Sequence, residues 1–232
     1  MVVLLVILTF AVLVGFEIIQ EQRRAKAAYR ERTGNEERSD SAWSRLVAGF
    51  KLPEPLHYHR GHTWLHWVSP QECYVGADDF ARRLVGTDMR LRLPRIGSYL
   101  HQGDDAVHVT RADRGEINLA SPVEGEVVSI NPRLQKDPGL LHRDPYGLGW
   151  LYKVRSRSLG RDVANLLDGT LAERWMEDTW DRFQRRLVVA SGSVIQTGGT
   201  LVDDLGDRLD PALWQALATE FLDAAPNRPT GR

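Results

Sequence analysis

Residues 121–134 read SPVEGEVVSINPRL, and this stretch decides the class of fold. Residues 125–130 form a short run that is rich in valine and isoleucine, which is typical of a β-strand. A proline at position 132 then indicates a short helix over residues 132–136. A brief strand that follows Gly and Pro residues predicts a small β domain.

The same pattern continues on both sides, over residues 53–157. Short apolar runs separated by Gly, Pro and Asp predict further strands, which we place at residues 63–68, 72–76, 89–93, 105–110, 116–120 and 150–154. A helix is expected at residues 78–84, where Asp78 or Asp79 can cap the first turn. The tripeptide Asp113-Arg114-Gly115 predicts a tight turn, and hence a hairpin between residues 110 and 116.

Five motifs in this region are more specific than the general pattern. They are His62-Thr63-Trp64, VGADDFA at 75–81, LPRIG at 93–97, the stretch 121–134, and DPYGLGW at 144–150. On these motifs, residues 62–151 resemble the H protein of the glycine cleavage system. The resemblance implies a mainly β, lipoyl-like barrel-sandwich hybrid whose projecting hairpin carries lipoate on a lysine.

Arg114 stands where the resemblance places that lysine, eight residues before Pro122. Lipoylation requires a primary amine that can lose a proton and attack an activated acyl group, whereas a guanidinium stays charged. No lysine lies between residues 52 and 135, so a small shift of alignment cannot supply one. The family's glutamate three residues before its lysine is Arg111 here. We therefore expect no lipoyl or other cofactor, and a protein that is not an enzyme.

The first twenty residues predict a membrane anchor. From position 2 to position 19 the chain is apolar except for Thr9, Gly15 and Glu17, and 18 helical residues span about 27 Å. Basic residues follow this run but do not precede it, which places the N-terminus outside and the remaining chain in the cytoplasm, at the inner membrane. A cleaved signal peptide is the alternative, because Ala25-Lys26-Ala27 has the form of a cleavage site.

The remaining segments lie on either side of the β domain. Residues 21–52 are expected to form a stalk, a linker and a short amphipathic helix at 41–50. Residues 158–223 predict a mostly helical extension, with one helix from 171, a short hairpin at 188–195 and 200–202, and a last helix starting at Asp210-Pro211. Residues 224–232 are expected to be disordered. The candidate interaction residues are Trp43, Phe50, Trp175, Trp180 and Trp214.

Neither the clustered histidines nor the cysteine indicates a chemical role. His57, His59, His62 and His66 crowd into ten residues, but no carboxylate or cysteine completes a recognised spacing, so we predict no metal site. Cys73 is the single cysteine, which excludes an internal disulfide, and it is expected to be an ordinary strand residue. With a formal net charge of -1, the chain gives no reason to expect a nucleic-acid partner.

The sequence favours a non-lipoylated accessory or scaffold subunit of a larger membrane complex on its cytoplasmic face. Its expected partners are integral membrane subunits and the bilayer, and no small-molecule substrate is predicted. A bioenergetic complex, such as a photosynthetic reaction-centre and antenna assembly or a respiratory enzyme, would be a suitable host. The alternatives are a carrier in a glycine-cleavage-like enzyme system and a membrane-anchored adaptor of an export system.

Overall fold

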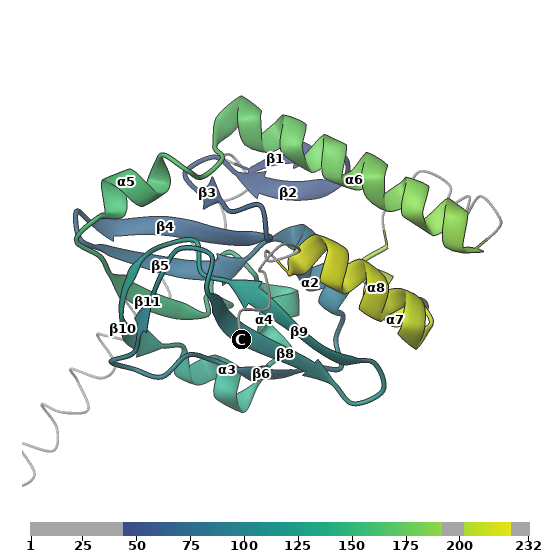
Figure 1. Cartoon of the computed structure of the whole chain (residues 1–232), viewed down its shortest axis with the longest axis horizontal. Helices are drawn as coiled ribbons and strands as arrows, with labels where there is room; N and C mark the ends of the chain where they lie inside the picture. The colour runs from purple at the N-terminus through teal and green to yellow at the C-terminus, as the bar shows by residue number, and fades with distance from the viewer. Residues whose placement is uncertain (1–43, 192–201, 224–232) are drawn as a thin grey trace, which may run out of the picture. The chain divides into compact units, whose positions relative to one another are not determined.

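Strands and short turns make up most of the β domain in the computed structural model, which describes residues 44–191 and 202–223 (Figure 1). The chain divides into two compact units, Met1–Ser44 and Arg45–Arg232, and the fold described here belongs almost wholly to the second. The predicted anchor and stalk, Trp43, residues 192–201 and the tail lie outside the described residues. None of the described helices combines the length and the apolarity that a membrane crossing requires.

The larger sheet contains six antiparallel strands in the order β3-β4-β5-β11-β10-β7. Their bounds are β3 His57–Tyr58, β4 Thr63–Ser69, β5 Glu72–Ala77, β7 Tyr99–Leu100, β10 Gly125–Ile130 and β11 Tyr152–Arg155. The strand predicted from the opening stretch, at residues 125–130, is confirmed with both of its ends.

The smaller sheet contains three antiparallel strands in the order β6-β8-β9, with β6 at Arg90–Arg92, β8 at Asp105–Arg111 and β9 at Gly115–Ala120. Val109 and Leu119 of this sheet share one buried apolar core with Val75 and Val154 of the larger sheet. The Thr63 hydroxyl also donates to the carbonyl of Ala120 at 3.0 Å. The predicted two-sheet β fold is therefore confirmed.

Short helices close the β domain, and their capping follows the sequence signals. In α2, at Asp79–Val85, the Asp78 carboxylate accepts a hydrogen bond from the amide of Ala81 at 2.8 Å. In α3, at Pro132–Lys136, Asn131 caps the first turn and proline occupies the first position. A further short helix, α4, lies at Leu140–Arg143.

The amphipathic helix predicted at residues 41–50 is wrong for the part described. Here the chain forms a hairpin of β1, Ser44–Val47, and β2, Phe50–Pro53. Ala48 and Gly49 connect the strands with φ values of 50° and 88°, and positive φ at both central residues is the requirement of a type I′ turn. The turn reverses the chain between Val47 and Phe50. These two apolar residues have the spacing of a helix, but they lie on two different strands, each of which buries one of them.

The C-terminal extension is helical, as predicted, but the first of its long helices is longer than expected. It comprises α5 at Leu159–Val163, α6 at Gly169–Ser191, α7 at Leu205–Arg208 and α8 at Pro211–Leu222. The Asp210 carboxylate caps α8 by accepting from the amide of Leu213. Residues 188–191 continue α6, so the strand predicted to begin at residue 188 is wrong over these residues.

An aromatic cluster joins the extension to the β domain. The Phe80 ring of α2 lies 5.4 Å from Phe50 and 5.5 Å from Phe183 of α6. Phe183 in turn lies 5.5 Å from Phe221 of α8. Aromatic pairs at these distances stabilise a core beyond the area that they bury, so α6 and α8 belong to the same packed unit as the sheets.

Candidate functional site

The end of the β8–β9 hairpin is the candidate site, because it carries Arg114. Arg111 and Gly115 form the last pair of the two strands, and Ala112, Asp113 and Arg114 make the turn between them. The amide of Arg114 donates to the carbonyl of Arg111 at 3.2 Å, and Gly115 adopts a φ of 105°. The predicted hairpin and its turn are confirmed.

The Arg114 side chain does not extend into solvent. Its guanidinium donates from Nη1 to the carbonyl of Leu209 and from Nη2 to the carbonyl of Asp207, the latter at 3.1 Å. Its Nε donates to the Asp113 carboxylate at 2.9 Å, and only 9% of the side chain is exposed. Main-chain acceptors of the C-terminal extension therefore bind the Arg114 side chain.

Arg111 binds the same part of the extension from the other end of the turn. It is 4% exposed, its Nη1 donates to the carbonyl of Val85 at 2.5 Å, and the same nitrogen lies 2.6 Å from the Asp207 carboxylate. Its guanidinium also lies 5.7 Å from the Trp214 ring, within range of a cation–π interaction. Both arginines of the hairpin end thus contact residues 207–214.

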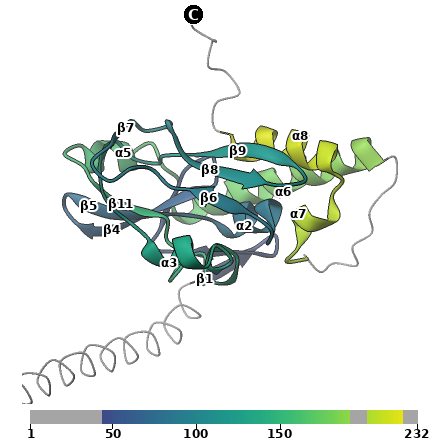
Figure 2. The same ribbon diagram turned by 90° about the horizontal axis from the view of Figure 1, so that it is seen from below.

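Helix α8 covers the free edge of the smaller sheet, and both views place it beside β9 (Figures 1 and 2). Gln215 donates to the carbonyl of Glu116 on that edge at 3.1 Å. The Trp214 ring is fully buried, and its Nε1 donates to the carbonyl of Leu84 in α2 at 2.6 Å. An exposed strand edge can pair with other chains, and here the chain's own extension occupies it.

Helix α7 approaches α2 so closely that residue 206 has no room for a side chain. A Cβ atom on Gly206 would lie 2.0 Å from the carbonyl oxygen of Leu84. Asp207, the next residue, accepts from the Thr87 hydroxyl at 3.0 Å as well as pairing with Arg111. The extension is therefore seated against the β domain by backbone packing and by charge.

Acidification is expected to loosen this contact. Partial burial would raise the pKa of the Asp207 carboxyl, but Arg111 and Thr87 hold it below its ordinary value of 3.8. Because the folded-state pKa is depressed, the pair stabilises the fold above that ordinary value, and its contribution is lost as the pH falls through the folded-state pKa. Asp207→Asn should cost about 1–2 kcal/mol at pH 7 and should reduce the loss of stability on acidification below pH about 4.

Urea unfolding at neutral and at acidic pH measures this effect. Asp88→Asn is the matched control, because Asp88 is an exposed carboxylate close to Thr87. Equal pH dependence of the wild-type chain and of Asp207→Asn would show that the Arg111–Asp207 pair does not hold the extension.

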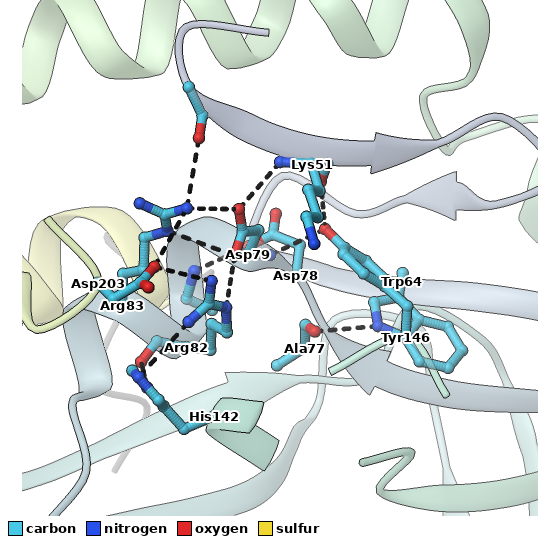
Figure 3. A network of polar contacts seen from close by, with 12 residues as sticks. Lys51, Trp64, Ala77, Asp78, Asp79, Arg82, Arg83, His142, Tyr146 and Asp203 are labelled. Atoms are coloured by element: carbon cyan, nitrogen blue, oxygen red, sulfur yellow. Dashed lines mark hydrogen bonds and ion pairs between the residues drawn. The ribbon is translucent and has the colours of Figure 1, made fainter. Parts of the chain in front are cut away.

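A buried polar network centred on Asp79 joins β2, α2 and the extension (Figure 3). The Asp79 carboxylate contacts Arg82, accepts from Arg83 at 3.2 Å, and accepts from the amide of Lys51 at 2.9 Å. Asp203, which precedes α7, lies 3.2 Å from Arg82 and 3.4 Å from Arg83. These contacts connect β2, α2 and the residues before α7.

Tyr146, from the DPYGLGW motif, fastens a loop to the same network. Its hydroxyl donates to the carbonyl of Lys51 at 2.6 Å and accepts from the amide of Asp79 at 2.9 Å. Burial raises the pKa of Tyr146 well above its ordinary value, so the hydroxyl keeps its proton. The tyrosine of the DPYGLGW motif therefore attaches this loop to β2 and to the start of α2.

The four clustered histidines point to different surroundings. His62 is buried, its Nδ1 lies 2.8 Å from Asp78 Oδ2, and its ring stacks on that of Phe80 with 4.3 Å between the centroids. His59 accepts at Nδ1 from the amide of Gly61, and His66 is exposed. Within residues 44–191 and 202–223, no three metal-binding side chains gather. The Cys73 thiol is fully buried, and burial raises its pKa to about 12, so it is not a reactive thiolate.

The structure corrects the expectation that the tryptophans form a partner-facing surface. Phe50 and Trp214 are fully buried, and Trp175 is 8% exposed. Trp180 is half-buried, and its ring lies 5.5 Å from Phe50. These side chains pack the extension onto the β domain, whereas Trp43 lies outside the described residues.

Comparison with known proteins agrees with the fold and with the motifs. The profile of the Glycine cleavage H-protein family matches residues 56–179, which is more than half of the chain. The chain belongs to the glycine cleavage H-protein family. It is 36% identical over 117 residues to the glycine cleavage system H protein of Aeromonas salmonicida (strain A449), a match that covers 50% of this chain and 89% of that relative.

Two further H proteins match about half of the chain. The H protein of Cronobacter sakazakii is 33% identical over 127 residues, covering 55% of this chain and 97% of the relative. The crystal structure of the H protein from Mycobacterium marinum covers 51% of this chain and 94% of its own, with 26% identity and a TM-score of 0.44. The family match ends at residue 179, so most of α6 and all of α7 and α8 are additional to the matched H-protein segment.

Proposed function

We propose that this chain is an H-protein-type subunit that does not carry lipoate and that uses its β domain as a structural and docking module. The observation that carries the proposal is the state of Arg114. A guanidinium occupies the position that the resemblance assigns to the lipoyl lysine, and two carbonyls of the extension accept its hydrogen bonds. An enzyme that attaches lipoate would find no amine at this position, and the extension covers the end of the hairpin.

The second candidate is a lipoyl carrier within a glycine-cleavage-like enzyme system. The comparisons favour it over a membrane scaffold, since the matched relatives are named glycine cleavage system H proteins and are covered over 89% to 97% of their length. Against it stand the chemistry of Arg114 and the absence of lysine from residues 52–135. An H protein is itself a carrier in such a system, so neither candidate makes this chain a catalyst.

The docking role that we propose is at a membrane. The apolar run at residues 2–19 and the basic residues after it support a single-pass anchor with the β domain in the cytoplasm. The extension also fits a stable scaffold for integral membrane subunits. It covers the hairpin end and the β9 edge of the smaller sheet, and its contacts hold both in one arrangement. The adaptor of an export system has no support from the described residues.

Mild solubilisation of membranes followed by native sizing tests this role. We expect the 26.2 kDa chain to migrate in a larger assembly with integral membrane subunits. Recovery of the chain only as a free monomer, or in a complex with soluble glycine-metabolising enzymes, would contradict the docking role. Deletion of residues 2–19 is the matched variant and should release the chain into the soluble fraction.

A further inference from the structure

A cavity of about 560 Å³ opens where α6, α8 and the turn after β3 meet. It lies towards the end of α8, where Phe221 lines it, whereas Gln215 near the start of that helix contacts the hairpin. Ligand sites of small molecules commonly have volumes of about 300–1,000 Å³. The cavity exists because the extension packs on the β domain, and the proposed docking role does not use it.

Hydrogen-bond donors without partners surround this cavity. Thr179 lines it, is fully buried, and has no hydrogen-bond partner for its hydroxyl oxygen. A buried polar group without a partner is unfavourable and calls for an explanation, such as a ligand that is absent. Arg60 and Arg185 also line the cavity, and among the described residues neither pairs with a carboxylate.

His59 supplies another donor at neutral pH. The amide of Gly61 donates to its Nδ1 at 3.1 Å, so that nitrogen carries a lone pair. Burial, followed by the neighbouring His62 and Arg60, lowers the pKa of His59 to about 4, so the ring is neutral and its proton resides on Nε2. The cavity lining thus offers a neutral N–H group in addition to the guanidinium groups.

The acidic residues of the lining leave the donors in excess. Glu220 already pairs with Arg186 at 3.0 Å, and Asp223 has an interaction of its own. Asp178 remains as the one lining carboxylate without a partner among the described residues, against the three guanidinium groups of Arg60, Arg182 and Arg185. This balance favours an anionic ligand.

The other walls are aromatic. Trp175 and Phe221 line the cavity and are 8% and 4% exposed, and the guanidinium of Arg182 lies 5.3 Å from the Phe221 ring. Flat apolar walls together with a few polar groups are the usual composition of a small-molecule site. We propose that this cavity binds a small organic carboxylate with a planar apolar body, whose carboxylate contacts Arg185 and the Thr179 hydroxyl while its body packs on Trp175 and Phe221.

Titration of the full chain with 1-naphthoate by calorimetry tests the proposal. We expect saturable binding that is weakened at least tenfold in Arg185→Ala and several-fold in Thr179→Val. Valine has the shape of threonine without the hydroxyl, so Thr179→Val should fold normally and should be at least as stable as the wild-type chain when no ligand is present. Arg174→Ala removes an exposed arginine of α6 that does not line the cavity, and it should bind as the wild-type chain does.

Each other outcome overturns the proposal. If 1-naphthoate shows no saturable binding at millimolar concentration, or if Arg185→Ala and Thr179→Val bind it as tightly as the wild-type chain, the cavity is not its site. If 1-naphthalenemethanol, the neutral analogue, binds equally well, the carboxylate is not recognised. Partition into detergent or lipid would be the same for all variants, so it cannot imitate the expected pattern.

Discussion

Replacing Trp214 with alanine is expected to lower the free energy of unfolding by about 4 kcal/mol, the largest effect on stability that we predict. The indole is fully buried, lies between the hairpin end and α2, and donates to the carbonyl of Leu84 at 2.6 Å. Its removal would leave a cavity, an unpaired carbonyl and an Arg111 guanidinium without its aromatic neighbour. Urea unfolding followed by circular dichroism measures the change.

Trp214→Phe separates the contributions to this effect. Phenylalanine fills most of the space but cannot donate to Leu84, so about 1–2 kcal/mol should be lost. Hydrogen exchange should show faster exchange of the β8 and β9 amides in Trp214→Ala than in Trp214→Phe. If Trp214→Ala cost less than about 1 kcal/mol, α8 would not be part of the cooperative fold, and the description of the hairpin end as closed would be wrong.

The second large effect is expected for Asp79→Ala, at about 3–5 kcal/mol. The Asp79 carboxylate is buried and contacts both Arg82 and Arg83, whose side chains are 10% and 8% exposed. Without it, two guanidinium groups would stay buried with Asp203 as their remaining carboxylate, and Asp203 is 70% exposed. The amide of Lys51 would also lose its acceptor.

Thermal and urea unfolding measure this loss, with Asp181→Ala as the matched control for an exposed acid on α6. Asp79→Asn should lie between the wild-type chain and Asp79→Ala, because the amide oxygen can still accept from Lys51. A loss below about 1 kcal/mol for Asp79→Ala would mean that Arg82 and Arg83 find other partners or reach water. The network in Figure 3 would then not be what joins α2 to β2 and to the extension.

Local signals made the β domain predictable. Glycine and proline mark its turns, Asp78 caps α2, and the strand at residues 125–130 follows from a short β-branched run. The hairpin at residues 44–53 was not predictable from periodicity, because Val47 and Phe50 have the spacing of a helix as well as that of two strands joined by a tight turn. Positive φ at Ala48 gives no signal in the sequence, since alanine rarely adopts it.

The candidate site was found in sequence only by its missing lysine. That Arg111 and Arg114 bind the extension depends on contacts across more than 90 residues, for which spacing gives no rule. One signal was available: two arginines in the hairpin and an acidic run at 203–207 in the extension have opposite charge. In sequence, Trp175, Trp180 and Trp214 fit a packed core as well as an interface, because Trp is common in both, and burial alone distinguishes the two.

The intact mass of the full chain tests the central claim most directly. The chain would be expressed with a lipoate-attaching enzyme and a supply of lipoate, beside the H protein of Aeromonas salmonicida as the positive control, and each would be weighed by mass spectrometry and mapped by digestion. We expect a lipoyl increment on the control and an unmodified mass for this chain, with Lys26, Lys51, Lys136 and Lys153 free of lipoate. A lipoyl increment on any residue of this chain would contradict it.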